Sequence, residues 1–136
     1  MSAQELEKTR TAARRHGFTL LFFSAVLGFT LEAAHALKLS GYLDIPLRRE
    51  LLTLAHAHGV GLALVLLAYA AVGAVDRQSA AVQRTLSIGS VLVPLGFALA
   101  SFDLHESDPG IGIVLVPLGA LAILRALYTV MRAAWL

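Results

Sequence analysis

The stretch LLTLAHAHGVGLALVLLAYAAVGAV, residues 51–75, decides the fold class of this chain. It contains no Asp, Glu, Lys or Arg across 25 residues. About 20 consecutive apolar residues in an α-helix cross the hydrocarbon core of a bilayer, so this run predicts a membrane-spanning helix. His56 and His58 stand near its start, and ionisable side chains in such a segment usually face a protein interior or a polar cavity.

The composition of the whole chain leads to the same class. Of its 136 residues, 57% are hydrophobic and only 15% are charged, with a mean hydropathy of +0.74. A soluble domain of this length needs a larger charged surface, so we predict an integral membrane protein in contact with the lipid bilayer. The absence of cysteine excludes disulfides and thiolate metal sites. We interpret the net charge of +2 as a sign of membrane topology and expect no nucleic-acid partner.

The apolar residues divide the chain into four segments: residues 18–39, 51–75, 86–102 and 111–135. Short connections make each helix antiparallel to its neighbour, which predicts an all-α, up-down four-helix bundle in a single transmembrane domain, residues 1–136. Residues 1–17 precede the first span, and the capping-box pattern Ser2-Ala-Gln-Glu5 predicts a short cytoplasmic helix there, with a frayed terminus as the alternative. We interpret the first apolar segment as a retained helix rather than a cleaved signal peptide.

The basic residues predict how the helices are oriented. Eight of them precede the first segment, lie in the second connection or fall toward the C-terminus: Lys8, Arg10, Arg14, Arg15, Arg77, Arg84, Arg125 and Arg132. The remaining three lie in or beside the first connection: Lys38, Arg48 and Arg49. Because cytoplasmic loops carry the excess of Lys and Arg, we expect both termini in the cytoplasm, as in a multi-pass protein of the bacterial inner membrane.

The hexapeptide VLVPLG occurs twice, at residues 91–96 and 114–119. Each copy falls inside a predicted helix, where a proline removes one backbone hydrogen bond and bends the helix. This would free the carbonyls of Ser90 and Ile113. Two interpretations stay open: either the two kinked helices pack closely on each other, or the repeat forms a hinge or a widened cavity.

The histidines and acidic residues gather at one end of the predicted bundle, near its outer face. They end the first helix, begin the second and follow the third: Glu32, His35, His56, His58, Asp103, His105 and Glu106. We call these seven residues the outer-face cluster. His16 is the exception, because it lies at the cytoplasmic end beside Arg15, and we interpret it as an interfacial residue.

Spacing within the outer-face cluster favours some partners over others. Glu32 and His35 are three residues apart, so both side chains lie on one face of a helix, as in the carboxylate metal sites of helical bundles. His56 and His58 are two residues apart, so their imidazoles point about 200° apart and do not readily bind one ion. We expect one of them to face the bundle interior and the other a neighbouring subunit, a second cofactor or lipid headgroups.

Together these residues predict a transition-metal or haem site near the outer face. Imidazoles combined with carboxylates suit zinc, iron or copper better than magnesium or calcium. All seven residues of the outer-face cluster are candidate metal ligands, and His56 and His58 are also candidate cofactor ligands. In the alternative, each side chain only meets water, headgroups or loop backbone, and Glu32 pairs with Lys38 or Arg49 to lock the first two helices together.

Three functions are compatible with this cluster. The first is a membrane metalloprotein with redox or other metal-dependent activity. The second is an accessory subunit of a respiratory assembly that uses the same residues to bind a quinone or a partner. The third is a proton-coupled carrier, which would need a dimer; a homo-oligomer or a larger membrane complex is therefore expected. No nucleophile motif, phosphate loop or dinucleotide fingerprint appears, so the sequence does not decide whether the protein is an enzyme.

Fragments of three segments resemble the YgdD-like family. They are AHALK at residues 34–38 after a glycine-containing helix, His58 with the apolar run after it, and PLG at residues 117–119. Members of this family are small four-helix membrane proteins of unknown function, so the resemblance implies four helices and no particular activity. The chain departs from the family pattern at three places: Glu32, His56 and residues 103–108.

Overall fold

The computed structural model describes residues 2–72, 80–104 and 108–135, and this part of the chain is helical, without a strand. Its elements, in chain order, are α1 (Ala3–Ala36), α2 (Ser40–Leu43), α3 (Pro46–Val72), α4 (Ala80–Ala100), the 3₁₀ helix η1 (Ile111–Val114) and α5 (Leu115–Ala134). Within the described residues, α1, α3, α4 and the η1–α5 segment are long and apolar enough to cross a membrane. The predicted all-α class with four apolar helices is therefore confirmed.

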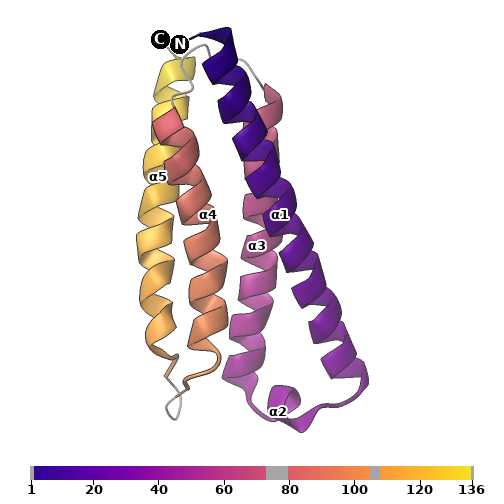
Figure 1. The fold of residues 1–136 in the computed structure, drawn as a ribbon. Helices are drawn as coiled ribbons and strands as arrows, with labels where there is room; N and C mark the ends of the chain where they lie inside the picture. The colour runs from indigo at the N-terminus through magenta and orange to yellow at the C-terminus, as the bar shows by residue number, and fades with distance from the viewer. Residues whose placement is uncertain (1, 73–79, 105–107, 136) are drawn as a thin grey trace.

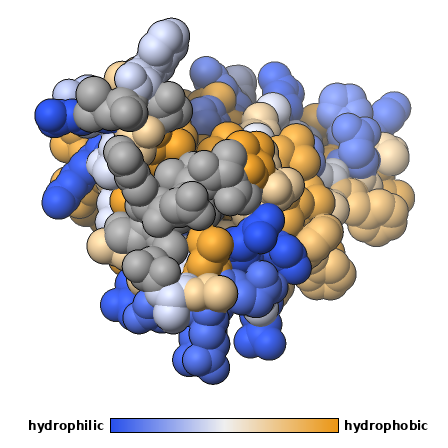
Figure 2. All heavy atoms as spheres, turned by 90° about the horizontal axis from the view of Figure 1, so that it is seen from above, coloured by the Kyte–Doolittle hydropathy of each residue, from blue (hydrophilic) through white to orange (hydrophobic). Residues whose placement is uncertain are grey.

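The long helices lie side by side, and both chain ends lie at the same end of the molecule, which we call the terminal end (Figure 1). The opposite end holds α2, the end of α4 and the start of η1, and we call it the α2 end. Viewed onto the terminal end, hydrophilic residues gather around the helix ends and hydrophobic residues appear between them (Figure 2). Large apolar side chains are exposed along the helices between the two ends, among them Phe18, Phe22, Phe29, Ile88, Leu121 and Leu124.

α1 is a single helix of 34 residues, so the helix predicted in the N-terminal segment is present and continues without a break into the first apolar segment. Its predicted capping box is confirmed: the Glu5 N–H donates to Ser2 Oγ at 3.2 Å, and the Ser2 N–H donates to Glu5 Oε2 at 2.8 Å. The helix ends three residues before the predicted boundary because Lys38 adopts a left-handed φ of 53°. The Lys38 N–H then donates to the His35 carbonyl at 3.1 Å, which turns the chain toward α2.

The other predicted boundaries shift toward longer helices. Residues 40–43, predicted as a connection, form α2, and α3 begins at Pro46, five positions before the predicted start. Proline is favoured in the first turn of a helix, because its missing N–H would have no intrahelical partner there. α4 begins at Ala80 rather than residue 86, which brings Gln83 into the helix. The predicted end of the second segment, residues 73–75, lies outside the described residues.

The two VLVPLG copies have different roles. Pro94 interrupts the inside of α4 as predicted, but Pro117 lies in the first turn of α5, where its missing N–H breaks no hydrogen bond. The prediction of a second proline inside a helix was therefore wrong, because residues 111–114 form η1 and α5 starts only at Leu115. The copies do pack on each other: a Cβ added at Gly119 would lie 2.9 Å from the Leu92 Cβ.

The four long helices do not close into a symmetric bundle. α1, α3 and α4 contact one another, although α1 and α4 touch only slightly, and α5 packs on α4. In the described part of the chain, the α5 backbone closely approaches only α4 and η1, so α4 is the central helix. The reason lies in the small residues of the last segment: Gly112 and Gly119 both face α4 and fix α5 there.

Small residues also allow α1 and α3 to approach closely. Most of the buried residues on their facing sides have small side chains or none. They are Thr9, Ala13, Gly17 and Ser24 on α1, and Ala55, Gly59, Ala63 and Ala70 on α3. Such stripes support close packing of helices in membranes. Gly59 occupies the point where three helices meet, because a Cβ there would collide with the Ser24 hydroxyl of α1 and lie 3.6 Å from the Pro94 Cβ of α4.

Candidate functional site

His56 points toward α1. Its Nδ1–H donates to the backbone carbonyl of Ser24 at 2.9 Å. The imidazole lies against Gly28, where an added Cβ would come within 2.5 Å of the ring carbon Cε1. Gly28 thus leaves the space that the ring fills, and the hydrogen bond ties α3 to α1. The first of the two imidazoles in residues 51–75 therefore has a packing role.

His58 points toward α4. Its Nδ1–H donates to the Leu54 carbonyl one turn earlier in its own helix at 2.9 Å. The exposed ring lies with its centroid 5.0 Å from that of Phe97. The prediction that the two imidazoles point apart is therefore confirmed. In both rings the Nδ1 proton takes part in a hydrogen bond. Nε2 is then the ring atom that can accept a hydrogen bond or bind a metal.

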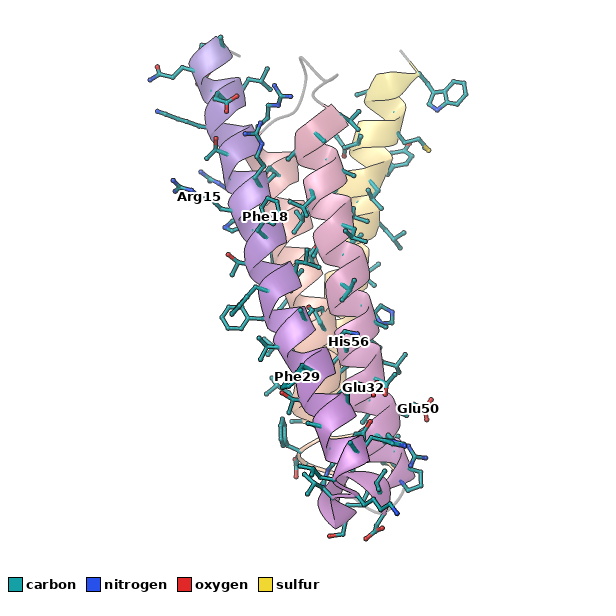
Figure 3. The ribbon with its side chains drawn as sticks, turned by 90° about the vertical axis from the view of Figure 1, so that its right-hand side faces the viewer. Arg15, Phe18, Phe29, Glu32, Glu50 and His56 are labelled. Carbon is teal, nitrogen blue, oxygen red and sulfur yellow. The ribbon has the colours of Figure 1, made fainter. Side chains whose placement is uncertain are left out.

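Glu32 and His35 lie near the end of α1, and both are exposed. Figure 3 shows Glu32, Glu50 and His56 in the half of the molecule nearest α2, and Arg15 and Phe18 in the terminal half. In the described part of the chain, Glu32 forms no ion pair.

The predicted salt bridge from Glu32 to Arg49 is absent among the described residues. Arg49 Nη1 donates instead to the Leu43 carbonyl at 3.4 Å. Its neighbour Arg48 donates from Nε to the Ser101 carbonyl at 3.0 Å and from Nη1 to the Gly41 carbonyl at 2.8 Å. The basic residues at the start of α3 therefore bind the backbone of α2 and of the turn after α4.

The outer-face cluster does not converge among the described residues. Asp103 follows α4 and is exposed, while His105 and Glu106 lie outside the described residues. In the part of the chain that the structure describes, no three His, Asp or Glu side chains come together in a way that could hold a metal ion. The seven-residue metal site thus stays a prediction, and it depends on His105 and Glu106.

A polar network joins α1 to α4 in the terminal half of the molecule. Ser87 Oγ lies 2.9 Å from His16 Nδ1, and Gln83 Nε2 lies 2.8 Å from Ser87 Oγ and 3.3 Å from His16 Nδ1. Gln83 and Ser87 are only 4% and 6% exposed and lie one turn apart on the same face of α4. These two buried groups therefore satisfy each other and hold the His16 ring.

The protons of this network follow from its chemistry. The Gln83 amide nitrogen is only a donor, so His16 Nδ1 and Ser87 Oγ accept from it. The Ser87 hydroxyl is then free to donate to His16 Nδ1. A neutral imidazole with Nδ1 as the acceptor carries its proton on Nε2. His16 therefore presents an N–H donor on the side of the ring away from Nδ1, and the described residues offer it no acceptor.

An apolar groove of about 660 Å³ lies between α1 and α4, with His16 and Ser87 at its terminal end and Ala55 of α3 contributing to its floor. Apart from these three, the lining residues are Thr19, Leu20, Phe23, Ser24 and Leu27 from α1, and Ile88, Val91, Leu92, Pro94, Leu95 and Ala98 from α4. The first VLVPLG copy thus forms much of one wall, which favours the widened-cavity interpretation for that copy.

A second hollow, of about 550 Å³, lies along the first turns of α1. Its described lining residues are Gln4, Glu7, Lys8, Thr11, Ala12, Arg15 and His16. His16 therefore lines both spaces, with the apolar groove on one side and a charged hollow on the other. Glu7 lies 3.9 Å from Arg14, whereas Lys8 and Arg15 form no ion pair with the residues that the structure describes.

This second polar region has only a weak signal in the sequence. By sequence alone, His16 is an interfacial residue and Gln83 belongs to a connection. The four-residue spacing of Gln83 and Ser87 is a usable signal only if α4 is known to begin at Ala80. The partner on α1 cannot be assigned from spacing, because it comes from a helix 67 residues earlier in the chain.

Comparison with known proteins gives no match: no family model, no curated protein and no solved structure matches the chain. The resemblance to the YgdD-like family therefore stays a prediction.

Proposed function

We propose that this chain is a multi-pass integral membrane protein with both termini in the cytoplasm. Four apolar helices of sufficient length and exposed aromatic residues on the outer surface support it, since Phe18, Phe22 and Phe29 are 62%, 63% and 77% exposed. Soluble monomers rarely expose contiguous apolar surface on this scale. Of the ten Lys and Arg residues in the described part of the chain, only Lys38, Arg48 and Arg49 lie next to α2, and the other seven lie elsewhere on α1, α4 and α5, which supports the orientation.

The cysteine-free chain makes this orientation testable with single cysteines. Ser2→Cys and Ser40→Cys place one thiol at the terminal end and one at the α2 end. We expect a membrane-impermeant maleimide to label Ser40→Cys in right-side-out vesicles and Ser2→Cys only in inverted ones. The opposite pattern would reverse the orientation, and labelling of both from one side would contradict the transmembrane arrangement.

Within the membrane, the proposed function is to bind a lipophilic molecule with a polar head in the groove between α1 and α4, as an accessory subunit of a larger assembly. The observation that carries this proposal is the His16 ring, held through Nδ1 by Gln83 and Ser87 at one end of a mostly apolar groove. Small-molecule sites are typically apolar, of about 300–1,000 Å³, with a few polar groups that fix the ligand's orientation. A volume of about 660 Å³ lies within that range.

The alternatives are the predicted metal centre and the proton-coupled carrier. The metal centre would use His56 or His58 with other residues of the outer-face cluster, and the rings of these two histidines contact different helices, α1 and α4. A carrier would need ionisable groups in sequence across the membrane. No contact among the described residues favours either alternative over the groove.

Copurification tests the groove directly. We would purify the protein in a mild detergent and identify bound small molecules by native mass spectrometry followed by organic extraction. Val91→Trp fills the groove from α4, and Leu118→Trp adds the same bulk to a comparably exposed position on α5. We expect the first variant to lose most of its bound lipophilic molecule and the second to keep it. Retention in both variants, or no bound molecule in the parent protein, would contradict the proposal.

A further inference from the structure

We infer that the groove binds an anionic phospholipid from the leaflet at the terminal end, with one acyl chain in the groove and the phosphate against the first turns of α1. This inference rests on the proposed binding function of the groove and names its ligand class. It is carried by three features of the described residues: the charge beside the groove, the length of the groove and the donor between the two spaces.

The charge beside the groove is positive. The hollow that shares His16 with the groove is also lined by Lys8 and Arg15, which form no ion pair in the described part of the chain. The one carboxylate in this hollow, Glu7, lies 3.9 Å from Arg14 outside it. Two cations thus line a hollow that adjoins the apolar groove at His16, the residue that lines both spaces. A phosphate could form charge-assisted hydrogen bonds with Lys8 and Arg15, whereas the head of an uncharged lipid or a quinone could not form an ion pair with them.

The length of the groove fits one leaflet. On α4 it extends from Ser87 to Ala98, a rise of about 17 Å at the α-helical rise per residue. Half of the hydrocarbon core of a bilayer is about 15 Å thick. An acyl chain that starts near His16 would therefore end close to the bilayer midplane, at the level of Leu27 and Ala98. The groove matches a chain confined to one leaflet better than a ligand that spans both.

The donor between the two spaces suits the region where a phospholipid changes from apolar to charged. The His16 Nε2–H, which follows from the contacts of Gln83 and Ser87 with Nδ1, can donate to an ester carbonyl or to a phosphate oxygen. Arg15 is the next residue on α1 and lines the hollow just beyond it. Along the site, an apolar wall is thus followed by an N–H donor and then by a cation. An anionic phospholipid has matching groups in the same order: an acyl chain, an ester carbonyl and a phosphate.

Fluorescence quenching by brominated lipids tests this inference on the full chain. The chain has one tryptophan, so the Trp135→Phe variant has no tryptophan fluorescence of its own. In it, Phe23→Trp places a reporter in the groove, and Leu121→Trp places one on α5, outside it, both at positions that are 64% exposed. The vesicles contain brominated phosphatidylglycerol or brominated phosphatidylcholine in matched mole fractions. We expect at least a fivefold preference for phosphatidylglycerol at Phe23→Trp and none at Leu121→Trp.

Charge variants then separate the site from general attraction to an anionic surface. Each basic residue near a membrane surface contributes about a fivefold factor in the binding of anionic lipid. Arg15→Gln should therefore lower the preference at Phe23→Trp about fivefold, while Arg132→Gln, an equal loss of charge on α5, should leave it unchanged. An equal loss in both variants would overturn the inference, because it would show only surface attraction.

The remaining outcomes distinguish this inference from the proposed function. Suppose that the two lipids quench Phe23→Trp equally, and more strongly than they quench Leu121→Trp. This result would overturn the inference that the ligand is anionic, but it would support a lipophilic binding site. A quinone that quenches Phe23→Trp in preference to phosphatidylglycerol would do the same. Quenching at Phe23→Trp no stronger than at Leu121→Trp would overturn the inference, and copurification with Val91→Trp would then decide the proposed function separately.

Discussion

The two polar regions of this molecule differ in what their side chains reach. Near the α2 end the sequence is rich in histidines and acids, yet His56 binds the backbone of α1 and His58 binds its own helix. In the terminal half the described histidines are fewer, but His16 of α1 meets Gln83 and Ser87 of α4. Density of ionisable residues along a chain therefore does not locate a site, because the rotation of each helix decides which side chains meet.

The largest effect should come from the three-helix contact that separates these regions. Gly59→Leu adds a side chain where a Cβ already collides with Ser24 and approaches Pro94, so we expect a loss of about 3 kcal/mol in the free energy of unfolding. Gly61→Leu is the matched control, because a Cβ there meets nothing within 4 Å. Unfolding in mixed micelles measures both. Equal losses would show that the helices do not meet at Gly59.

Removal of the His56 contact should have the next largest effect. His56→Ala loses the hydrogen bond to Ser24 and leaves a void against Gly28, which together cost about 2 kcal/mol. Gly28→Ala should destabilise the parent protein but not the His56→Ala variant, because the added methyl group then occupies the space of the ring. Additive losses in this double-mutant cycle would contradict the packing role.

The network of the terminal half should contribute less to stability. Ser87→Ala removes the hydroxyl that links His16 to Gln83, and hydrogen bonds between membrane helices are worth about 1 kcal/mol or less. Thr129→Ala is the control, because the Thr129 hydroxyl bonds only to a carbonyl of its own helix, in α5. If Ser87→Ala and Gln83→Leu have independent effects on unfolding, the network does not act as a unit.

His58→Ala should have a smaller effect than any of these changes. Its ring is exposed and its hydrogen bond lies within α3, so we expect a loss of about 0.5 kcal/mol, mostly from the contact with Phe97. His56→Ala serves as the matched comparison for His58→Ala, since the two residues lie two positions apart on the same helix. A larger loss for His58→Ala would indicate that this ring has a partner at the α2 end.

For metal content we expect no difference at all. Elemental analysis and an optical spectrum of the purified protein should give the same result for the parent, His35→Ala and His58→Ala. The reason for this expectation is that the Nδ1 atom of His58 binds a carbonyl of its own helix and its ring lies beside Phe97 of α4. Stoichiometric zinc, iron, copper or haem that is lost in either variant would restore the metal site predicted at the α2 end.

Much of the fold is predictable from local patterns. The uncharged run from Leu51 onward indicates a membrane-length helix, Ser2 and Glu5 indicate the start of α1, and the spacing of His56 and His58 indicates their divergence. These features depend on residues within a few positions of each other. The boundaries were less predictable, because Pro94 and Pro117 stand in the same hexapeptide but only the first lies within a helix.

The candidate site depends on distant residues, and so only the tertiary structure places it. The sequence by itself determined that the chain forms apolar helices and at which level along each helix the polar groups stand, since hydrophobic periodicity and length act locally. The tertiary structure decided that α5 packs on α4 alone, that Gly28 makes room for His56, and that His16 faces Ser87. Helix rotation and the choice of neighbours follow from close packing at small residues spread over the whole chain, and such long-range complementarity has no local sequence signal.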